Sequence, residues 1–161
     1  MIRFLIMDVD GTLTDGKIHM GEVGETHKSF NIKDGYGIRH ILPEFHIEPI
    51  ILTGRESGIV LNRCKELHIN EVFQGVADKA SFLRQLQNAR QFTLHEVAYI
   101  GDDLNDYDIM CRIKAGGGIV GCPQDSVRKV LEIADHVCTK CGGDGAVREF
   151  IEFLVDSEEK I

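Results

Sequence analysis

The fold is decided by the stretch Met7-Asp8-Val9-Asp10-Gly11-Thr12-Leu13-Thr14-Asp15-Gly16. It follows an apolar run, residues 2–7, that is typical of a buried strand. Side chains alternate along an extended chain, so Asp8 and Asp10 point the same way, and a sharp turn at Gly11 brings both carboxylates together. Open α/β sheets bind their ligands at that end of the strands. Two carboxylates there can hold a hard divalent cation, with one serving as a nucleophile and the other in proton transfer.

The composition is that of a globular domain of ordinary size. The chain has 161 residues, 43% of them hydrophobic and 27% charged, and we expect one domain over residues 1–161. Its net charge of −8, without a basic stripe, argues against nucleic acid as a partner. The first apolar run is too short to span a membrane and lacks signal-peptide features, so we expect no membrane partner and a cytoplasmic location.

Cysteine usage indicates free thiols. The cysteines have no framework spacing, so we expect reduced and mostly buried side chains at Cys64, Cys111, Cys122, Cys138 and Cys141. The pair Cys138 and Cys141, with His136 close by, could be half a zinc site, but the sequence has no second pair of this kind. The sequence therefore leaves the role of Cys138 and Cys141 open.

Periodicity and turn signals predict a hairpin followed by alternating helices and strands. Ile18 and Met20 alternate with polar neighbours before a glycine-rich turn, which favours a hairpin flap at about 17–32. Asp34 is expected to cap the next helix, which runs to about Phe45. Beyond it we predict strands at 49–53, 71–73, 97–100, 118–120 and 136–137, and helices at 57–67, 78–89, 104–113, 125–134 and 146–155. This order predicts an α/β fold, a Rossmann-like three-layer sandwich with a parallel sheet, and a Gly-rich hinge and tail at about 142–161.

Three later motifs complete a recognisable set. Thr53 ends the apolar run 49–52, Lys79 opens a predicted helix, and Gly101-Asp102-Asp103-Leu104-Asn105-Asp106 ends the run 97–100. Taken singly, a strand-end threonine or a helix lysine is more often structural than functional. In this order after the opening Asp-x-Asp-Gly-Thr, they resemble the four motifs of the haloacid dehalogenase (HAD) superfamily, which implies a phosphatase.

The resemblance implies a role for each motif residue. Asp8 would attack phosphorus and become an aspartyl phosphate, while Asp10 would protonate the leaving oxygen and then activate water. Mg²⁺ would be the cofactor, held by Asp8, Asp102 and, through its backbone carbonyl, Asp10. Thr53 and Lys79 would stabilise the charge of the transferred phosphoryl group.

Spacing points to a subfamily without a cap domain. Only residues 17–52 separate the first two motifs, and a helix and a short strand fill the interval from Thr53 to Lys79, so no cap domain fits. Asp103 and Asp106 are expected to support the metal ligands by hydrogen bonding. Four further stretches resemble the 3-deoxy-D-manno-octulosonate 8-phosphate phosphatases, namely 30–39, 53–55, 73–75 and 142–149.

This finer resemblance implies a substrate and an assembly. The enzyme would hydrolyse a sugar-acid phosphate in lipopolysaccharide precursor synthesis and act as a homotetramer in which neighbouring subunits cover each site. A sugar acid carries a carboxylate, and the residues expected to help bind the substrate are Gly54, Arg55, Arg39, Lys28 and Arg148.

Two alternatives remain open. Phosphatases of nine-carbon nonulosonate 9-phosphates, of the sialic acid type, share most of these motifs. A non-catalytic regulatory partner of a sugar-nucleotide synthetase would keep the fold without turnover, but every catalytic position here is filled, which argues against it. Hydrolysis of p-nitrophenyl phosphate with and without Mg²⁺ separates the second alternative from the phosphatases.

Overall fold

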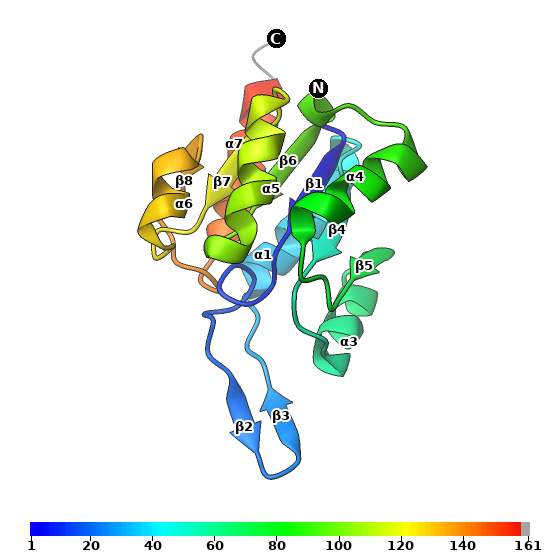
Figure 1. Ribbon diagram of the computed structural model, residues 1–161. Coiled ribbons are helices and arrows are strands. Elements are labelled where there is room, and N and C mark those ends of the chain that lie inside the picture. The colour runs from blue at the N-terminus through cyan, green and yellow to red at the C-terminus, as the bar shows by residue number, and fades with distance from the viewer. Residues whose placement is uncertain (159–161) are drawn as a thin grey trace.

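A six-stranded parallel sheet forms the centre of the computed structural model, which describes residues 1–158 (Figure 1). Every pairing in this sheet is parallel, with β1 in the interior and β5 and β8 at the edges. Its strands, in spatial order, are β5 (Glu71–Phe73), β4 (Glu48–Leu52), β1 (Phe4–Met7), β6 (Val97–Ile100), β7 (Ile119–Cys122) and β8 (His136–Val137). The predicted parallel α/β sheet is confirmed.

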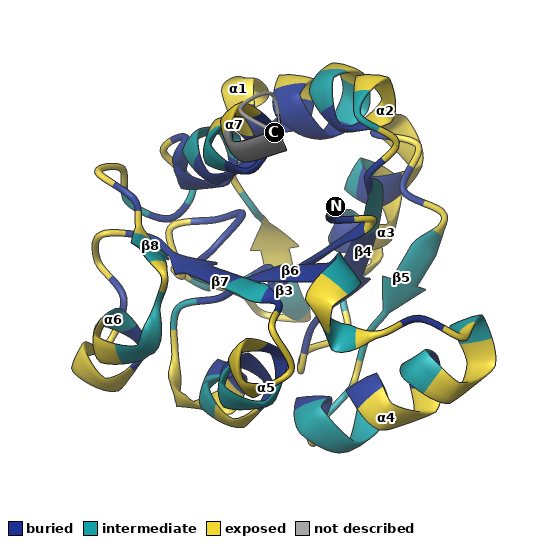
Figure 2. Ribbon diagram, turned by 90° about the horizontal axis from the view of Figure 1, so that it is seen from above, coloured by how far each residue is buried: buried dark blue, intermediate teal, exposed yellow. Residues whose placement is uncertain are grey.

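Helices cover both faces of the sheet, as Figure 2 shows. One face carries α1 (Ile32–Tyr36), the π-helical turn η1 (Gly37–Ile41), α2 (Leu42–Glu44), α3 (Gly58–Glu66) and α7 (Ala146–Glu158). The other face carries α4 (Lys79–Arg90), α5 (Leu104–Ala115) and α6 (Arg128–Ile133), and the short 3-10 turn η2 (Leu94–Glu96) precedes β6. The result is the predicted three-layer sandwich, with one apolar cluster on each face.

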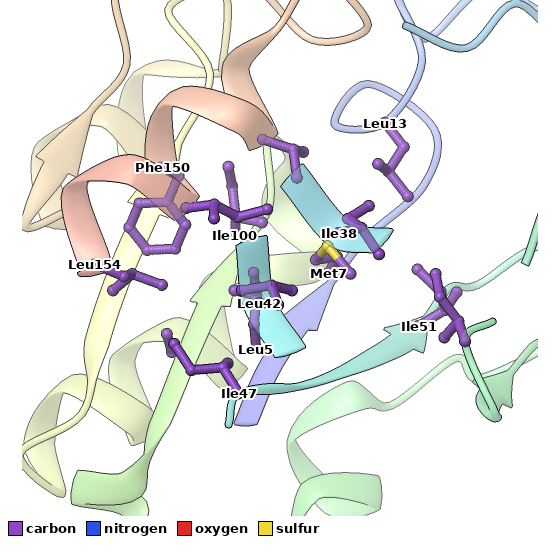
Figure 3. Close-up of a cluster of buried hydrophobic side chains, with 14 of the residues drawn as sticks. Leu5, Met7, Leu13, Ile38, Leu42, Ile47, Ile51, Ile100, Phe150 and Leu154 are labelled. Atoms are coloured by element: carbon purple, nitrogen blue, oxygen red, sulfur yellow. The ribbon is translucent and has the colours of Figure 1, made fainter. Parts of the chain in front are cut away.

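The two clusters follow from the alternation of side chains along β1. Leu5 and Met7 point to the face covered by α7, while Phe4 and Ile6 point to the face covered by α4 and α5. Figure 3 shows Leu5 and Met7 in one cluster with Phe150 of α7. Because both faces are covered, all four β1 residues are buried, and each contributes about 1.5–3 kcal/mol to folding.

Two acidic residues expected to begin helices instead bind other parts of the chain. Asn31 caps α1, with its Oδ1 accepting from the backbone N–H of Lys33 at 2.8 Å. Asp34 lies buried inside α1 and accepts from the N–H of Arg148 at 2.8 Å, so it stabilises the start of α7. Similarly, α6 begins at Arg128 and not at residue 125, because Asp125 accepts from the N–H of Gly142 at 2.9 Å.

The segment between β1 and α1 forms the predicted hairpin. Its strands are β2 (His19–Gly21) and β3 (Gly24–His27), which pair with each other and project away from the body of the protein (Figure 1). Met20 and Val23 are exposed large apolar residues on this hairpin. Among the described residues, no helix is long and apolar enough to cross a membrane.

Strand register brings three loop starts to one place. Met7 of β1 lies opposite Ile51 of β4 on one side and Ile100 of β6 on the other. The loops that follow these three parallel strands therefore begin side by side, at the interior of the sheet. These loops carry Asp8, Asp10, Thr53 and Asp102, whereas Lys79 comes from the start of α4.

Candidate active site

A cleft of about 300 Å³ lies beyond the carboxyl ends of β1, β4 and β6. Its wall combines carboxylates, glycines and one cation: Asp8, Asp10, Gly16, Ile18, Thr53, Gly54, Arg55, Asp102, Asp103 and Asn105. Six of these residues were predicted from the sequence to act directly on substrate or metal. The fold therefore assembles residues that lie up to a hundred positions apart along the chain.

Lys79 joins two acids beneath this cleft. Its Nζ lies 2.8 Å from Oδ1 of Asp8 and 2.6 Å from Oδ1 of Asp106, and all three side chains are nearly inaccessible. Burial alone would lower the pKa of Lys79, but the charges of Asp8 and Asp106 outweigh burial and raise the pKa. The lysine is therefore a fixed ammonium that bonds one oxygen of Asp8.

Local structure explains how a lysine reaches this position. Lys79 is the first residue of α4, where Asp78 caps the helix by accepting from the N–H of Ser81 at 2.8 Å. Tyr99 of β6 completes the arrangement, because its hydroxyl lies 2.5 Å from Oδ1 of Asp106 and 3.3 Å from Nζ of Lys79. Tyr99 is fully buried, so this hydroxyl holds the lysine without access to solvent.

The acids crowd together in a way that suits a divalent cation. One carboxylate oxygen from each of Asp8, Asp102 and Asp106 lies within 4.8 Å of the others. Burial, reinforced by the neighbouring Asp106, raises the pKa of Asp8 to about 6. Burial and the charge of Asp8 raise the pKa of Asp102 to about 8. Asp8 and Asp102 are oxygen ligands whose mutual repulsion a bound cation would relieve, so this pair fits Mg²⁺.

Gly11 makes room for this cluster. Its φ of +90° is a conformation that L side chains rarely adopt, and a Cβ at this position would overlap the Asp102 carboxylate. Thr12, the next residue, donates from Oγ1 to Oδ1 of Asp102 at 3.1 Å. Gly11 thus allows the loop after β1 to approach Asp102 in the loop after β6, and Thr12 orients the Asp102 carboxylate.

Asp106 supports the site from within the protein. Its Oδ1 accepts from Lys79 and Tyr99, and its Oδ2 accepts from the backbone N–H groups of Asp102 at 2.9 Å and Asp103 at 3.3 Å. Each oxygen of Asp106 thus already accepts two hydrogen bonds, so no lone pair is left for a cation, which favours a supporting role over metal ligation. Asp103 is the N-cap of α5 and accepts from the N–H of Leu104 at 2.7 Å.

Asp10 faces the hairpin. Lys28, whose side chain is 1% exposed, forms an ion pair with Asp10 and a second one with Glu25 at 2.8 Å. Arg55 approaches the same two acids, with Nε 3.7 Å from Oδ2 of Asp10 and Nη2 3.8 Å from Oε1 of Glu25. Burial would lower the pKa of Lys28, but its bonds to Asp10 and Glu25 raise it. The hairpin segment therefore positions the ammonium group of Lys28 beside Asp10.

Three predicted cations are absent from the lining of the cleft: Lys28 lies beside it through its ion pair with Asp10, whereas Arg39 and Arg148 lie elsewhere. Arg39 borders a separate hollow with Tyr36 and Arg63, on the face that α1 and α3 cover. Arg148 pairs with Glu152 along α7 at 2.7 Å, an ion pair between residues four apart on one helix. Of the predicted substrate cations, Arg55 therefore lines the cleft and Lys28 lies beside it on Asp10.

Sequence reasoning missed several residues that hold the site. Glu25 binds Lys28 and accepts from Ser57 Oγ at 2.8 Å, and Tyr99 and Thr12 bond the acidic cluster. Glu25 is one acid among several polar hairpin residues, and Tyr99 reads as an ordinary strand residue. Of these residues, only Thr12 could have been identified from the sequence, because it lies inside the opening motif.

Comparison with known sequences and structures gives a consistent family. The sequence profile of the family described as haloacid dehalogenase-like hydrolase matches residues 63–151. The 3-deoxy-D-manno-octulosonate 8-phosphate phosphatase of Escherichia coli K12 is 40% identical over 160 residues, which cover 99% of this chain and 82% of that protein. The Yersinia pestis enzyme of the same name is 38% identical, covering 99% of this chain and 83% of its own.

Solved structures of such enzymes share the whole fold. The cobalt-bound form of the deoxy-D-mannose-octulosonate 8-phosphate phosphatase from Haemophilus influenzae superposes with a TM-score of 0.90 at 36% identity, covering 99% of this chain and 90% of that one. The Moraxella catarrhalis enzyme, in complex with a magnesium ion, a phosphate ion and a KDO molecule, gives a TM-score of 0.89 at 36% identity, covering 97% and 87%.

Proposed function

This chain belongs to the haloacid dehalogenase-like hydrolases and, within them, to the 3-deoxy-D-manno-octulosonate 8-phosphate phosphatases, and we propose that it releases phosphate from that eight-carbon sugar-acid ester. It is a phosphoric monoester hydrolase. The observation that carries this function is the Asp8–Lys79–Asp106 arrangement beside Asp102, which offers a fixed carboxylate nucleophile next to a cation site.

Mg²⁺ is the proposed cofactor, as in the magnesium complex of the Moraxella relative. Asp8, Asp102 and the backbone carbonyl of Asp10 would hold it. When bound, it supplies charge neutralisation between the carboxylate nucleophile and the dianionic phosphate ester. The pKa values of Asp8 and Asp102 are both raised, and a bound cation would favour the ionised forms of these two carboxylates.

In the first half-reaction, an oxygen of Asp8 attacks phosphorus and the bond from phosphorus to the sugar oxygen breaks. Lys79 donates to Oδ1 of Asp8, which fixes the rotation of the carboxylate before attack. Thr53, which follows β4 and lines the cleft, would donate its hydroxyl to a phosphoryl oxygen. The product of this step is an aspartyl phosphate on Asp8 and a free sugar alkoxide that needs a proton.

Asp10 supplies that proton and later takes one back. In its protonated form it donates to the leaving oxygen, and as a carboxylate it accepts a proton from the water that attacks the aspartyl phosphate. Hydrolysis releases inorganic phosphate and restores Asp8. Because Lys28 pairs with Asp10 in the structure, substrate binding must draw Lys28 away for Asp10 to carry the proton.

The substrate carboxylate gives Lys28 and Arg55 another anion to bind. Arg55 is half-exposed at the cleft rim, and its guanidinium can bond a carboxylate through two parallel hydrogen bonds. Gly54 next to it leaves room for the sugar close to the backbone. Arg39 and Arg148 keep a proposed substrate-binding role only towards a neighbouring subunit's site.

The proposal extends to assembly and location. The exposed Met20 and Val23 on the hairpin support a homotetramer in which neighbours cover each open cleft. The chain would act as one domain over residues 1–161 in the cytoplasm.

Phosphate release from a substrate panel tests this function. The wild type is assayed with and without Mg²⁺ on 3-deoxy-D-manno-octulosonate 8-phosphate, a nonulosonate 9-phosphate and glucose 6-phosphate. We expect the highest kcat/KM for the eight-carbon acid and loss of turnover in EDTA that Mg²⁺ restores. A tenfold preference for the nine-carbon ester would move the assignment to that substrate, and no hydrolysis of any ester would contradict the phosphatase function.

A further inference from the structure

A second group of metal-ligating side chains lies away from the catalytic cleft. His136 of β8, Cys138 directly after it, and Glu149 of α7 bring a nitrogen, a sulfur and an oxygen atom within 4.8 Å of one another. They come from the edge strand of the sheet and from the helix that covers that end of it (Figure 2). We propose that His136, Cys138 and Glu149 bind a zinc ion that fastens β8 to α7.

The imidazole of His136 turns its Nε2 towards Glu149. Its Nε2 is buried and finds no hydrogen-bond partner within residues 1–158, although it lies 3.6 Å from Oε1 of Glu149. The ring is held in this position by stacking on Phe153, with centroids 4.2 Å apart and planes at 19°. A buried and unpaired nitrogen beside a carboxylate is costly, and a cation between the two groups removes that cost.

The carboxylate is held by Thr139, the residue directly after Cys138. Glu149 accepts from the backbone N–H of Thr139 at 2.8 Å and from its hydroxyl at 3.0 Å. Such outer hydrogen bonds orient a metal ligand and reduce the entropy it loses on binding. Glu149 is therefore fixed before any ion arrives.

The thiol is the ligand that selects the metal. Cys138 is 1% exposed, and its Sγ donates to the carbonyl of Ala146 at 3.3 Å. On binding, the S–H proton leaves to solvent, the bond to Ala146 is lost, and a sulfur–zinc bond forms. A compact set of one thiolate, one imidazole and one carboxylate favours zinc over Mg²⁺, with solvent at the fourth position.

The position of the site gives it a structural use. β8 has only two residues and lies at the sheet edge, so few backbone hydrogen bonds hold it. The loop between Cys138 and α7 reaches the catalytic motif, because the N–H of Gly143 donates to the carbonyl of Thr12 at 3.1 Å. A zinc ion here would fix the strand, the helix and the loop that backs the catalytic turn.

Cobalt absorption tests this site separately from the catalytic carboxylates. Metal-free protein is titrated with Co²⁺ in the presence of excess Mg²⁺, and the thiolate-to-cobalt charge-transfer band is followed in the near ultraviolet. Since no cysteine is among the residues that line the described cleft, that band reports a sulfur ligand elsewhere. We expect a band that saturates at one Co²⁺ per chain and that Zn²⁺ abolishes.

Matched variants identify the ligands. Cys138→Ser should lose the band, and His136→Gln and Glu149→Gln should weaken Co²⁺ affinity at least tenfold, while Cys141→Ser and Cys111→Ser keep the wild-type affinity. Zinc at a hundredfold excess over its Kd should raise the wild-type Tm by roughly 5–10 °C and leave that of Cys138→Ser unchanged. A wild type without a charge-transfer band, or a band that survives in a folded Cys138→Ser protein, would overturn the proposal.

Discussion

Nζ of Lys79 lies 2.8 Å from Oδ1 of Asp8, and the same ammonium lies 2.6 Å from Oδ1 of Asp106. The buried ammonium of Lys79 thus forms ion pairs with two buried carboxylates. Removing it leaves both acids without their partner, which in buried pairs costs about 3–5 kcal/mol of stability. Lys79→Met should therefore lower the free energy of unfolding by about that amount, measured in urea, and reduce kcat by roughly 100-fold or more.

Tyr99→Phe is the matched control for Lys79. It removes one hydroxyl from the same group and leaves both ion pairs in place, so we expect a loss of only about 1–2 kcal/mol. Its kcat should stay within roughly tenfold of the wild type. A Lys79→Met protein with wild-type kcat would remove Lys79 from the proposed mechanism.

Asp34 makes stability depend on pH. Burial raises the pKa of Asp34 to about 6, above its ordinary value of 3.8, even though Arg148 and Gly145 donate backbone hydrogen bonds to it. For an acid whose folded pKa is raised, the stabilising contribution is complete below about pH 4 and is lost as the pH rises through about 6.

Asp34→Asn should therefore be more stable than the wild type above pH 6, by about 1–3 kcal/mol, and nearly equal to it at pH 4. The amide oxygen can still accept from the start of α7. Urea denaturation at several pH values measures the difference, with Glu44→Gln as an exposed control on the adjoining helix. A gap that shrinks as the pH rises would show that the ionised carboxylate is favoured.

The Asp34 case shows what the sequence could and could not predict. Short apolar runs predicted the strands, and the bounds of β5, β6 and β8 match the prediction. No other structural signal in these runs competes with that of a strand. An acidic residue before an apolar stretch can cap the helix that follows it or the start of a distant helix. Asp34 accepts from the N–H of Arg148, 114 positions away, and only tertiary packing decides between these two outcomes. Local signals therefore placed Asp34 wrongly.

The site divides in the same way. Motif residues such as Asp8, Thr53 and Asp102 were identified by their resemblance to the HAD motifs, and they lie together because parallel strands share one carboxyl edge. Tyr99 and Glu25 were not, since their contacts depend on side chains that meet only in three dimensions. The same limit applied to the zinc site, where the sequence showed Cys138 and His136 but not Glu149.

Arg55 should decide substrate preference. Arg55→Ala is expected to lower kcat/KM for the sugar-acid phosphate roughly 10–100-fold, because a charged hydrogen-bond partner of the carboxylate is lost. Hydrolysis of p-nitrophenyl phosphate, which has no carboxylate, should change less than about threefold. Arg128→Ala removes an exposed arginine on α6 and is the control. Equal losses on both substrates would assign Arg55 to phosphate binding instead.

The hairpin should hold the assembly together. Replacing Met20 and Val23 by Asp puts charge on two exposed apolar positions, so we expect the mass from light scattering to fall below that of the tetramer and activity to fall with it. Leu61→Asp, on exposed α3 surface, should leave the mass unchanged. A wild type that is fully active as a monomer would contradict this assembly.

The central claim is that Asp8 carries the phosphoryl group, and trapping that intermediate tests it most directly. Wild-type protein is mixed with 3-deoxy-D-manno-octulosonate 8-phosphate and Mg²⁺, quenched in acid during turnover, digested and analysed by mass spectrometry. We predict a phosphorylated peptide containing Asp8, and neither adduct nor phosphate release with Asp8→Asn, whose amide keeps the shape but is a poor nucleophile. Phosphate release by pure Asp8→Asn at more than about one hundredth of the wild-type rate would contradict the account.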